Sequence, residues 1–459
     1  MALGVAFAAK LVLARKMPPQ AMGIVVTAQS FVALTLAAAE LGIPDAVVRF
    51  VGREAEPGAA PKRTVSLGLH IVVPAALLTA AVVLAVVLGW SGAAMTNDAR
   101  WTTVILTGAL PLLAVGDVLG AAYRGVNRLA TKLFAIDVAR PGVVVLALLI
   151  SPVALTQYAS YVAALYAAGA LLTAAALWLL FVRDARWHDR GTGSARDLLR
   201  FGVPIAGAGI IAGPLVNSAL PLMLASWPGP TAVALFTVAL SLQAVVYVPM
   251  GVLEQAVIPT WTRMIVHDTR AELAASYTQF TNLGFSAAAS LGILLVANDR
   301  AILDFLFGPT YEAASWALRC AIAAALFAAA TGPNEAMLRA LGLTTSIFHA
   351  RIAAALGGLV AGTILIPVYE LRGGVVAFVL ASVAVNGLYG VILYRAGDIL
   401  PFSRSHTLTV FLAIGGLLSA FMVSGPFSTS AWIAAHICAL TVLAVNADLR
   451  SNLRKLLIP

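Results

Sequence analysis

Long apolar segments separated by short polar stretches run along the entire chain. Fourteen can be counted, with ends defined to about three residues. They are 1–15, 20–42, 65–90, 102–123, 131–152, 157–182, 200–226, 230–253, 277–297, 313–333, 344–368, 372–394, 406–424 and 429–446. A helix needs about 20 mostly apolar residues to cross a bilayer, so this pattern predicts transmembrane helices. The first segment is shorter, which indicates either a short first helix or a true start upstream of Met1.

The composition agrees with a membrane protein. Of the 459 residues, 61% are hydrophobic and only 11% are charged, whereas soluble domains carry about 25% charged residues. The sequence therefore predicts an all-α polytopic membrane protein of about fourteen helices. The net charge of +9 does not indicate nucleic-acid binding, because no basic run contains interleaved aromatic residues. Cys320 and Cys438 lie in apolar segments, which predicts small buried residues rather than a disulfide or a metal site.

The distribution of positive charge predicts the orientation. With the N-terminus inside, the loops on the inner side hold 22 of the 29 Lys and Arg residues, and those on the outer side hold five. Positive residues concentrate in cytoplasmic loops of membrane proteins, so we expect both termini in the cytoplasm. That arrangement requires an even number of spans. The predicted location is the cytoplasmic membrane of the cell.

An internal repeat divides the chain. Residues 224–244 resemble residues 13–33 at an offset of 211, and the match places Pro230 on Pro19. A second match, of Leu338-Arg339-Ala340 with Tyr123-Arg124-Gly125, follows at an offset of 215, although chance matches in an Ala-rich chain are the alternative. Repeats of this kind are common in transporters. The predicted parts are an N-terminal lobe (1–183), a flexible cytoplasmic linker with Gly and Ser (184–199), a C-terminal lobe (200–395), and two further helices with a cytoplasmic tail (396–459).

A succession of loose motifs resembles one known family. The motifs are LARKMPPQAMG at 13–23, LGIPDAVVRF at 41–50, YRGVNR at 123–128, FGVPIAGAG at 201–209, LFGPTYEAASWALR at 306–319, LRALGLTTSIFHARI at 338–352 and LIPVYELRGGVVAFVLASV at 365–383. In this order they resemble the polysaccharide biosynthesis proteins, or O-antigen-type flippases, of the superfamily that includes MATE multidrug exporters and lipid II flippases. The short first helix departs from the family pattern.

The resemblance implies two six-helix lobes around a central cavity, with two added C-terminal helices. It also implies a function, which is movement of an undecaprenyl-diphosphate-linked oligosaccharide from the inner to the outer leaflet. The expected partners are this substrate, H+ or Na+ as a coupling ion, membrane lipids and other glycan-assembly proteins.

A diphosphate-sugar head group needs cationic and polar groups to replace its hydration inside a membrane. The candidates for binding it are Lys10, Arg49, Arg124, Asn217, Gln243 and Arg319. Each has a structural alternative: Lys10 and Arg319 can extend to the membrane surface, and Asn and Gln often connect helices. Arg49 shares a helix face with Asp45 and Arg53, so an ion pair at the inner surface is its alternative.

Three acids are candidates for coupling transport to an ion gradient. Asp117 is the deepest acid that we identify in the first lobe, and Glu254 and Glu335 lie at or near membrane depth in the second. Charged groups within a membrane are costly, which favours a functional interpretation. Pairing with Arg is the alternative for Asp117. Gln243 and Glu254 are about three helical turns apart and therefore share a face.

The chain lacks the signatures of common enzymes. It contains no HExxH motif, no paired Cys and no Walker A sequence, so we predict no catalytic residues, no metal, no cofactor and no direct use of ATP. Two other functions stay open. A MATE-like drug or cation antiporter would have an acid-dominated cavity and normally twelve helices, and a membrane enzyme of glycan assembly would have a large outer loop.

Overall fold

The structure is a computed structural model that describes residues 2–55, 60–89, 95–184, 186–188, 194–212, 214–266, 270–397 and 404–422. The chain forms two compact units, Met1–Ala234 and Leu235–Pro459, which are described in turn. Helices dominate both units, as the apolar pattern predicts.

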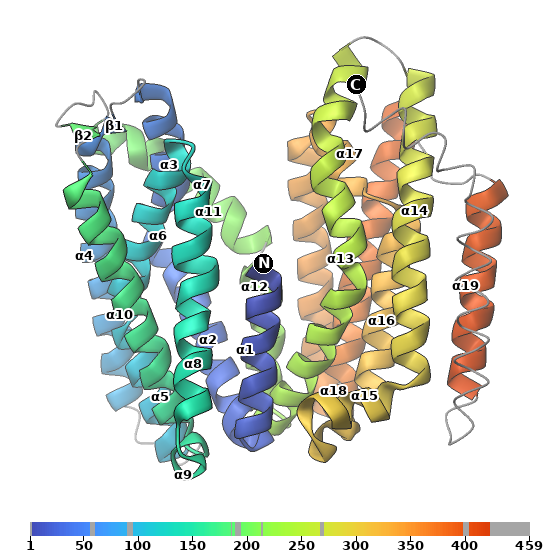
Figure 1. Ribbon diagram of the computed structural model, residues 1–459, viewed down its shortest axis with the longest axis horizontal. Helices are drawn as coiled ribbons and strands as arrows, with labels where there is room; N and C mark the ends of the chain where they lie inside the picture. Colours follow the sequence, from blue (N-terminus) through green and yellow to red (C-terminus); the bar gives the residue numbers. More distant parts are fainter. Residues whose placement is uncertain are drawn as a thin grey trace. The chain divides into compact units, whose positions relative to one another are not determined.

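The first unit is a helical bundle. Its elements are α1 (Ala2–Lys16), α2 (Pro19–Glu40), α3 (Ile43–Glu54), β1 (Ala60–Pro61), α4 (Lys62–Gly89), α5 (Asn97–Gly108), α6 (Leu110–Gly125), α7 (Leu129–Lys132), the π-helix η1 (Leu133–Ala139), α8 (Arg140–Ile150), α9 (Val153–Thr156), α10 (Ala159–Arg183), β2 (Trp187–His188), α11 (Ala195–Ala212) and α12 (Pro214–Ser226). The long helices α4, α6, α8 and α10 lie side by side, and α3 lies at one end of the bundle together with β1 and β2 (Figure 1).

A backbone break explains how α2 passes into α3. Leu41 and Gly42 both adopt left-handed conformations, with φ of 51° and 68°, and these end α2 at Glu40. The chain then enters α3, an amphipathic helix. Its buried residues are Ile43, Ala46, Val47 and Val51, and its exposed face carries Asp45, Arg49 and Arg53. The predicted shared face of these three charged residues is therefore confirmed.

The compact first unit extends beyond the predicted N-terminal lobe. It includes α11 and α12, because α11 packs on α3 and α12 packs on α2. The two turns related by the repeat also lie in this unit, where the Pro230 carbonyl lies directly against Gly23. The predicted lobes were defined by the sequence repeat, whereas the compact units are defined by packing. The lobe boundaries therefore stay a prediction.

The predicted linker contains an ordered anchor. Strand β2 pairs in parallel with β1, so that Ala60 lies beside Trp187. Trp187 is buried and packs against the rings of Phe181, at 4.9 Å, and Tyr123, at 5.9 Å. Within the predicted linker, the buried side chain of Trp187 thus connects residues 186–188 to the bundle.

The second unit continues the helical architecture. Its elements are α13 (Pro230–Val266, which begins in the first unit), α14 (Arg270–Ala297), α15 (Asp299–Phe307), the 3-10 helix η2 (Pro309–Ala314), α16 (Ser315–Thr331), α17 (Asn334–Ala340), α18 (Thr344–Gly397) and α19 (Arg404–Met422). Helix α14 packs on α16 and α19, and α16 packs on α18 (Figure 1). Glu370 has non-helical backbone angles, which divide α18 into the two predicted segments 344–368 and 372–394.

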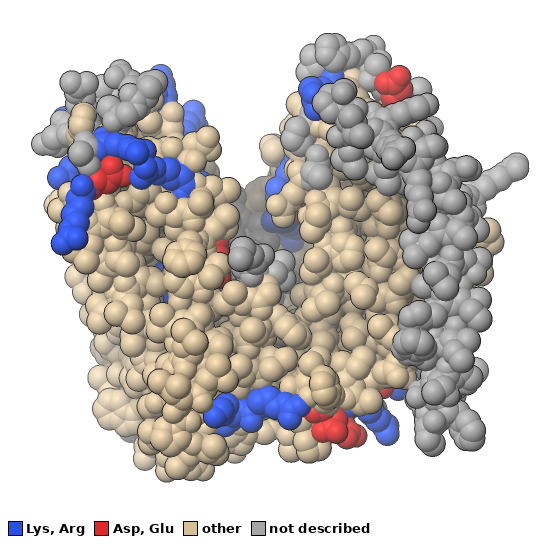
Figure 2. Space-filling model, in the orientation of Figure 1, with Lys and Arg blue, Asp and Glu red and all other residues tan. Residues whose placement is uncertain are grey.

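The predicted apolar segments agree with the helices. Every segment up to 406–424 coincides with one helix or a short series of helices, and 429–446 lies outside the described residues. Within the described part, nine helices are long and apolar enough to cross a membrane, and the interrupted α18 counts once among them. Large apolar side chains on α4, such as Leu78 at 68% and Val86 at 56% exposure, suit contact with lipid. Many Lys and Arg residues lie instead at the end of the first unit that carries α3, and Arg15 and Lys16 lie at the opposite end, where α1 ends (Figure 2).

Candidate functional site

A group of charged side chains lies inside the first unit, around Asp117 of α6. The Arg140 Nη2 atom at the start of α8 is 3.7 Å from the Asp117 Oδ1 atom. The carboxyl group of Glu40, the last residue of α2, contacts that of Asp117. Three separate helices therefore bring two carboxyl groups and one guanidinium together. We call these residues the Asp117 cluster.

Irregular backbone surrounds the Asp117 cluster. Glu40 immediately precedes the left-handed Leu41 and Gly42, and Arg140 immediately follows the π-helix η1. Gly116 makes room for the cluster, because a Cβ atom there would come 2.8 Å from Arg140 Nη2. π-helical turns occur frequently at functional sites, where they redirect side chains. Both helix irregularities thus aim charged groups at the same place.

Hydrogen bonding in the Asp117 cluster is incomplete. Glu40 Oε1, Arg140 Nε and Arg140 Nη2 are buried without a hydrogen-bond partner among the described residues. The neighbouring Lys132 and Asp137 form their own ion pair at 2.7 Å. Two carboxyl groups therefore share one guanidinium, and one proton or one monovalent cation would balance the charge. Buried groups left without partners are unusual and call for a functional explanation.

The acids of the second unit have different surroundings. Tyr247 donates a hydrogen bond of 2.7 Å to Glu254 Oε1. Glu335 pairs with Arg351 at 2.5 Å and also with Arg339. The predicted coupling residues Glu254 and Glu335 thus have bonded partners, whereas atoms of the Asp117 cluster have none within the described ranges.

Arg319 also takes part in a buried ion pair. Its Nε and Nη2 atoms donate to the two carboxylate oxygens of Asp299 at 2.5 and 3.2 Å, and Ser315 donates to the same carboxylate. Asp299 is only 3% exposed. The structure therefore places Arg319 in a bonded group that joins α15 to α16.

The other predicted binding residues are scattered. Arg124 pairs with Asp45 at 3.2 Å on the surface of the first unit. Lys10 is exposed on α1, and no ion pair or hydrogen bond holds its side chain within the described part of the chain. Gln243 is half-buried on α13. Asn217 lies in α12, but its side chain is outside the described residues.

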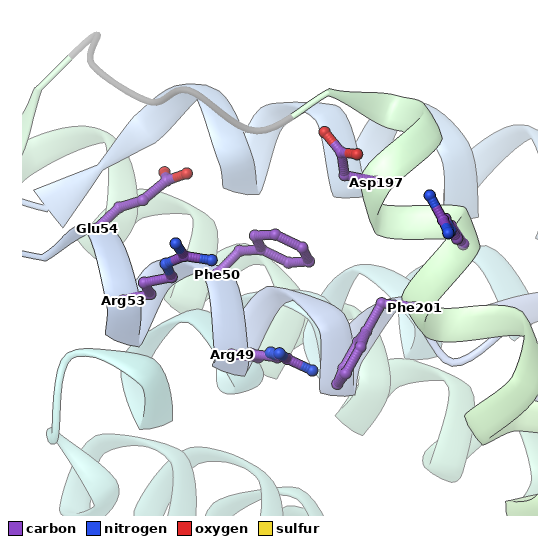
Figure 3. A pocket seen from close by; sticks show the side chains of 7 residues that line it. Arg49, Phe50, Arg53, Glu54, Asp197 and Phe201 are labelled. Carbon is purple, nitrogen blue, oxygen red and sulfur yellow. The ribbon is translucent and has the colours of Figure 1, made fainter.

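Arg49 lines an open cavity in the first unit. Its guanidinium lies over the ring of Phe201, 4.3 Å from the ring centre. The cavity has a volume of about 560 Å³ and lies between α3 and α11. Its lining consists of Arg49, Phe50, Arg53, Glu54, Asp197, Arg200 and Phe201 (Figure 3).

Glu40 was not among the site residues predicted from the sequence. Glu40 lies within the predicted apolar segment 20–42, and an acid at that position was the available signal. Arg140 was visible only as a charge inside a predicted segment. Among the described residues, no group of three or more His, Cys, Asp or Glu side chains converges as a divalent metal site would require.

A family model described as "Polysaccharide biosynthesis protein" matches residues 2–265, which is more than half of the chain. This region includes every described helix of the first unit and the whole Asp117 cluster. No curated protein sequence matches the chain.

Several solved structures share the fold. The lipid II flippase MurJ in its inward closed conformation has a TM-score of 0.72 and 11% identity, with 98% of this chain and 97% of that chain covered. An inward-facing multidrug resistance MATE family transporter of the MOP superfamily has a TM-score of 0.67 and 16% identity, covering 86% of this chain and 95% of that one. The eukaryotic MATE transporter AtDTX14 has a TM-score of 0.54 and 14% identity, with 95% and 98% covered. At these identities the likeness establishes a shared transporter fold.

Proposed function

The chain belongs to the polysaccharide biosynthesis protein family, and we propose that it is a flippase for a lipid-linked oligosaccharide. The proposed substrate is an undecaprenyl-diphosphate-linked oligosaccharide, which moves from the inner to the outer leaflet of the cytoplasmic membrane. The observation that carries the proposal is the family match, which spans the helices of the first unit in a chain with a transporter fold. The protein is then a transporter rather than an enzyme.

The fold of a lipid II flippase supports the proposed type of substrate. The structure with the highest TM-score given above is described as a flippase for lipid II. Moving a charged head group through about 30 Å of hydrocarbon requires a polar route with cationic groups. Lys10 is an exposed cation, without an ion pair among the described residues, on a helix inside the family match, and it therefore suits contact with a diphosphate.

We further propose that the Asp117 cluster couples transport to an ion gradient. Its surplus carboxyl group can take up one proton or one Na+, and its position at two helix irregularities would let that event alter the local backbone. The movement itself is proposed to be alternating access, with both chain termini in the cytoplasm. The coupling ion would provide energy in place of ATP.

Reconstitution of the full chain in proteoliposomes tests the proposed substrate. A fluorescent undecaprenyl-diphosphate oligosaccharide in the inner leaflet should become accessible from outside much faster with the protein than without it. A fluorescent organic cation is assayed in parallel vesicles. If the cation is transported against a pH gradient while the lipid is not, the proposal is wrong and a MATE-like antiporter is favoured.

The Asp117→Asn variant separates coupling from substrate choice. We expect it to move the lipid slowly and with little response to an imposed pH or Na+ gradient, while the wild type responds to one of them. The Glu312→Gln variant is the control, because Glu312 is an exposed acid that is not part of the cluster. An unchanged gradient response in Asp117→Asn would remove the cluster from the mechanism and leave the substrate proposal in place.

A further inference from the structure

The cavity between α3 and α11 combines three cationic and two aromatic side chains. Arg49 and Arg53 come from α3, and Arg200 comes from α11. All three arginines are exposed. Phe50 and Phe201 meet edge to face, with ring centres 6.1 Å apart, and form the apolar part of the lining. An anion with an attached apolar group would match this combination.

The two helices are held together by a glycine contact beside the cavity. A Cβ atom on Gly202 would come 2.7 Å from the Leu41 carbonyl oxygen, and one on Gly42 would overlap the Gly202 carbonyl. Only glycines permit such a close approach of two backbones. Figure 3 shows Arg49 and Phe201 close together, with Arg53 and Asp197 farther apart across the open space. The cavity is therefore built into the fold by a fixed contact between α3 and α11.

The acids of the lining are already engaged. Glu54 accepts a hydrogen bond of 2.8 Å from Thr64. Asp197 accepts one of 2.6 Å from the Ser194 hydroxyl, and Ser194 also lowers the pKa of that carboxyl. In the described part of the chain, Arg49, Arg53 and Arg200 form no ion pair with a carboxylate. Three guanidinium groups are thus available to an external anion.

The stacked side chain of Arg49 is held in an orientation that suits phosphate binding. The ring of Phe201 covers one face of the Arg49 guanidinium and restricts its rotation. The N–H groups at the edge of the plane then suit the paired oxygens of a phosphate. Fixing the group beforehand reduces the conformational entropy lost on binding.

The position of the cavity corresponds to the membrane surface. α3 begins three residues after the apolar α2 ends, and Arg200 immediately precedes the apolar part of α11. We propose that this cavity binds the phosphate of an anionic lipid head group in the membrane leaflet next to α3. The phenylalanines would lie against the adjoining glycerol and acyl carbons. This site is independent of which molecule the protein transports.

Native mass spectrometry of the purified full chain with phosphatidylglycerol tests the site. We expect the wild type to retain phosphatidylglycerol at least tenfold better than phosphatidylcholine, because the quaternary ammonium of phosphatidylcholine cancels the negative charge of its phosphate and is repelled by the three arginines. The triple variant Arg49→Gln, Arg53→Gln, Arg200→Gln should lose at least tenfold in retention. Arg49→Lys alone should lose a few-fold, because lysine keeps the charge without the planar stacked group.

A second triple variant controls for general surface charge. Arg63→Gln, Arg183→Gln, Arg186→Gln removes three charges from the first unit outside the cavity lining. It should retain phosphatidylglycerol within twofold of the wild type. Equal loss in both triple variants, or loss in neither, would overturn the proposal.

Inorganic pyrophosphate distinguishes a lipid from a soluble source of phosphate. At millimolar concentration it should displace phosphatidylglycerol only weakly, because it has no apolar part to contact Phe50 and Phe201. Cavity-dependent binding of pyrophosphate by a protein that does not prefer phosphatidylglycerol would overturn the assignment to a lipid.

Melting curves of both triple variants, with and without lipid, show whether each has folded. Gly202→Ala is an additional probe: it should reduce phosphatidylglycerol retention while all three arginines remain.

Discussion

The Asp117 cluster and the Asp299–Arg319 pair contain the same chemical groups in different states of bonding. In the first unit, Arg140 lies 3.7 Å from Asp117, and buried atoms of Glu40 and Arg140 lack hydrogen-bond partners among the described residues. In the second unit, Arg319 donates twice to Asp299, which also accepts from Ser315 and from the Arg300 backbone.

This difference distinguishes a structural ion pair from the site that we propose changes its charge during transport. A fully bonded pair holds two helices together, and adding a proton or a cation would only disrupt it. An incompletely bonded group with a surplus carboxyl can accept either one. The number of bonds that a charged side chain makes is therefore a better guide to its function than its presence within a membrane segment.

The largest effect on stability is expected at the bonded pair. Replacing Asp299 by Asn removes a buried carboxylate to which both Arg319 and Ser315 donate, which should lower the free energy of unfolding by about 3–5 kcal/mol. Chemical denaturation of the purified protein measures this. The exposed Glu312 in the following 3-10 helix provides the control, since Glu312→Gln should change stability by about 0.5 kcal/mol or less. Equal stability of the two variants would show that the Asp299–Arg319 pair does not stabilise the fold.

A substitution in the Asp117 cluster should have a small effect on stability and a large effect on transport. Asp117→Asn removes the surplus acid and leaves Glu40 to pair with Arg140, so we expect a stability change below about 1 kcal/mol. The initial rate of lipid transport should nevertheless fall at least tenfold. Initial rates in proteoliposomes and denaturation curves of the same preparation test both parts. A loss of stability comparable to that of Asp299→Asn would show that the cluster is structural.

A smaller difference in transport activity is expected between variants of Lys10 and variants of Arg124. In the part of the chain that the structure describes, Lys10 on α1 has no ion pair, while Arg124 is paired with Asp45 at the surface. Lys10→Ala should abolish or strongly reduce transport at normal protein levels, and Lys10→Arg should retain part of it. Arg124→Gln should keep at least half of the activity, because exposed ion pairs contribute little. Normal transport by Lys10→Ala would mean that this lysine only extends to the membrane surface.

The smallest effect on transport is expected for cysteine substitutions that test which side of the membrane each end of the bundle faces. Single cysteines at Thr96 and at Gly193, in a chain without Cys320 and Cys438, should leave transport within twofold of the wild type. An impermeant thiol reagent added from outside should label the cysteine at position 96 and not the one at 193. The reverse pattern would invert the orientation inferred from the positive charges. The phosphate site would then face the outer leaflet.

The sequence alone determined the class of the protein and the approximate ends of its helices. Apolar length is a local property, and helices are the structures that satisfy the backbone within each apolar segment. Proline and charged residues also marked helix ends, such as the start of α2 at Pro19. The deepest acid that we identified in the first lobe, Asp117, could be named because a charge inside an apolar run is visible in the sequence itself.

Tertiary structure decided which charges meet. Glu40, Asp117 and Arg140 are far apart in the chain, and a break at Leu41 and a π-helical turn before Arg140 bring them together. The same holds for the cavity, whose arginines come from α3 and α11 and depend on the contact between Gly42 and Gly202. Helix rotation and helix crossing arise from packing between distant segments, so the pattern along one segment does not contain them.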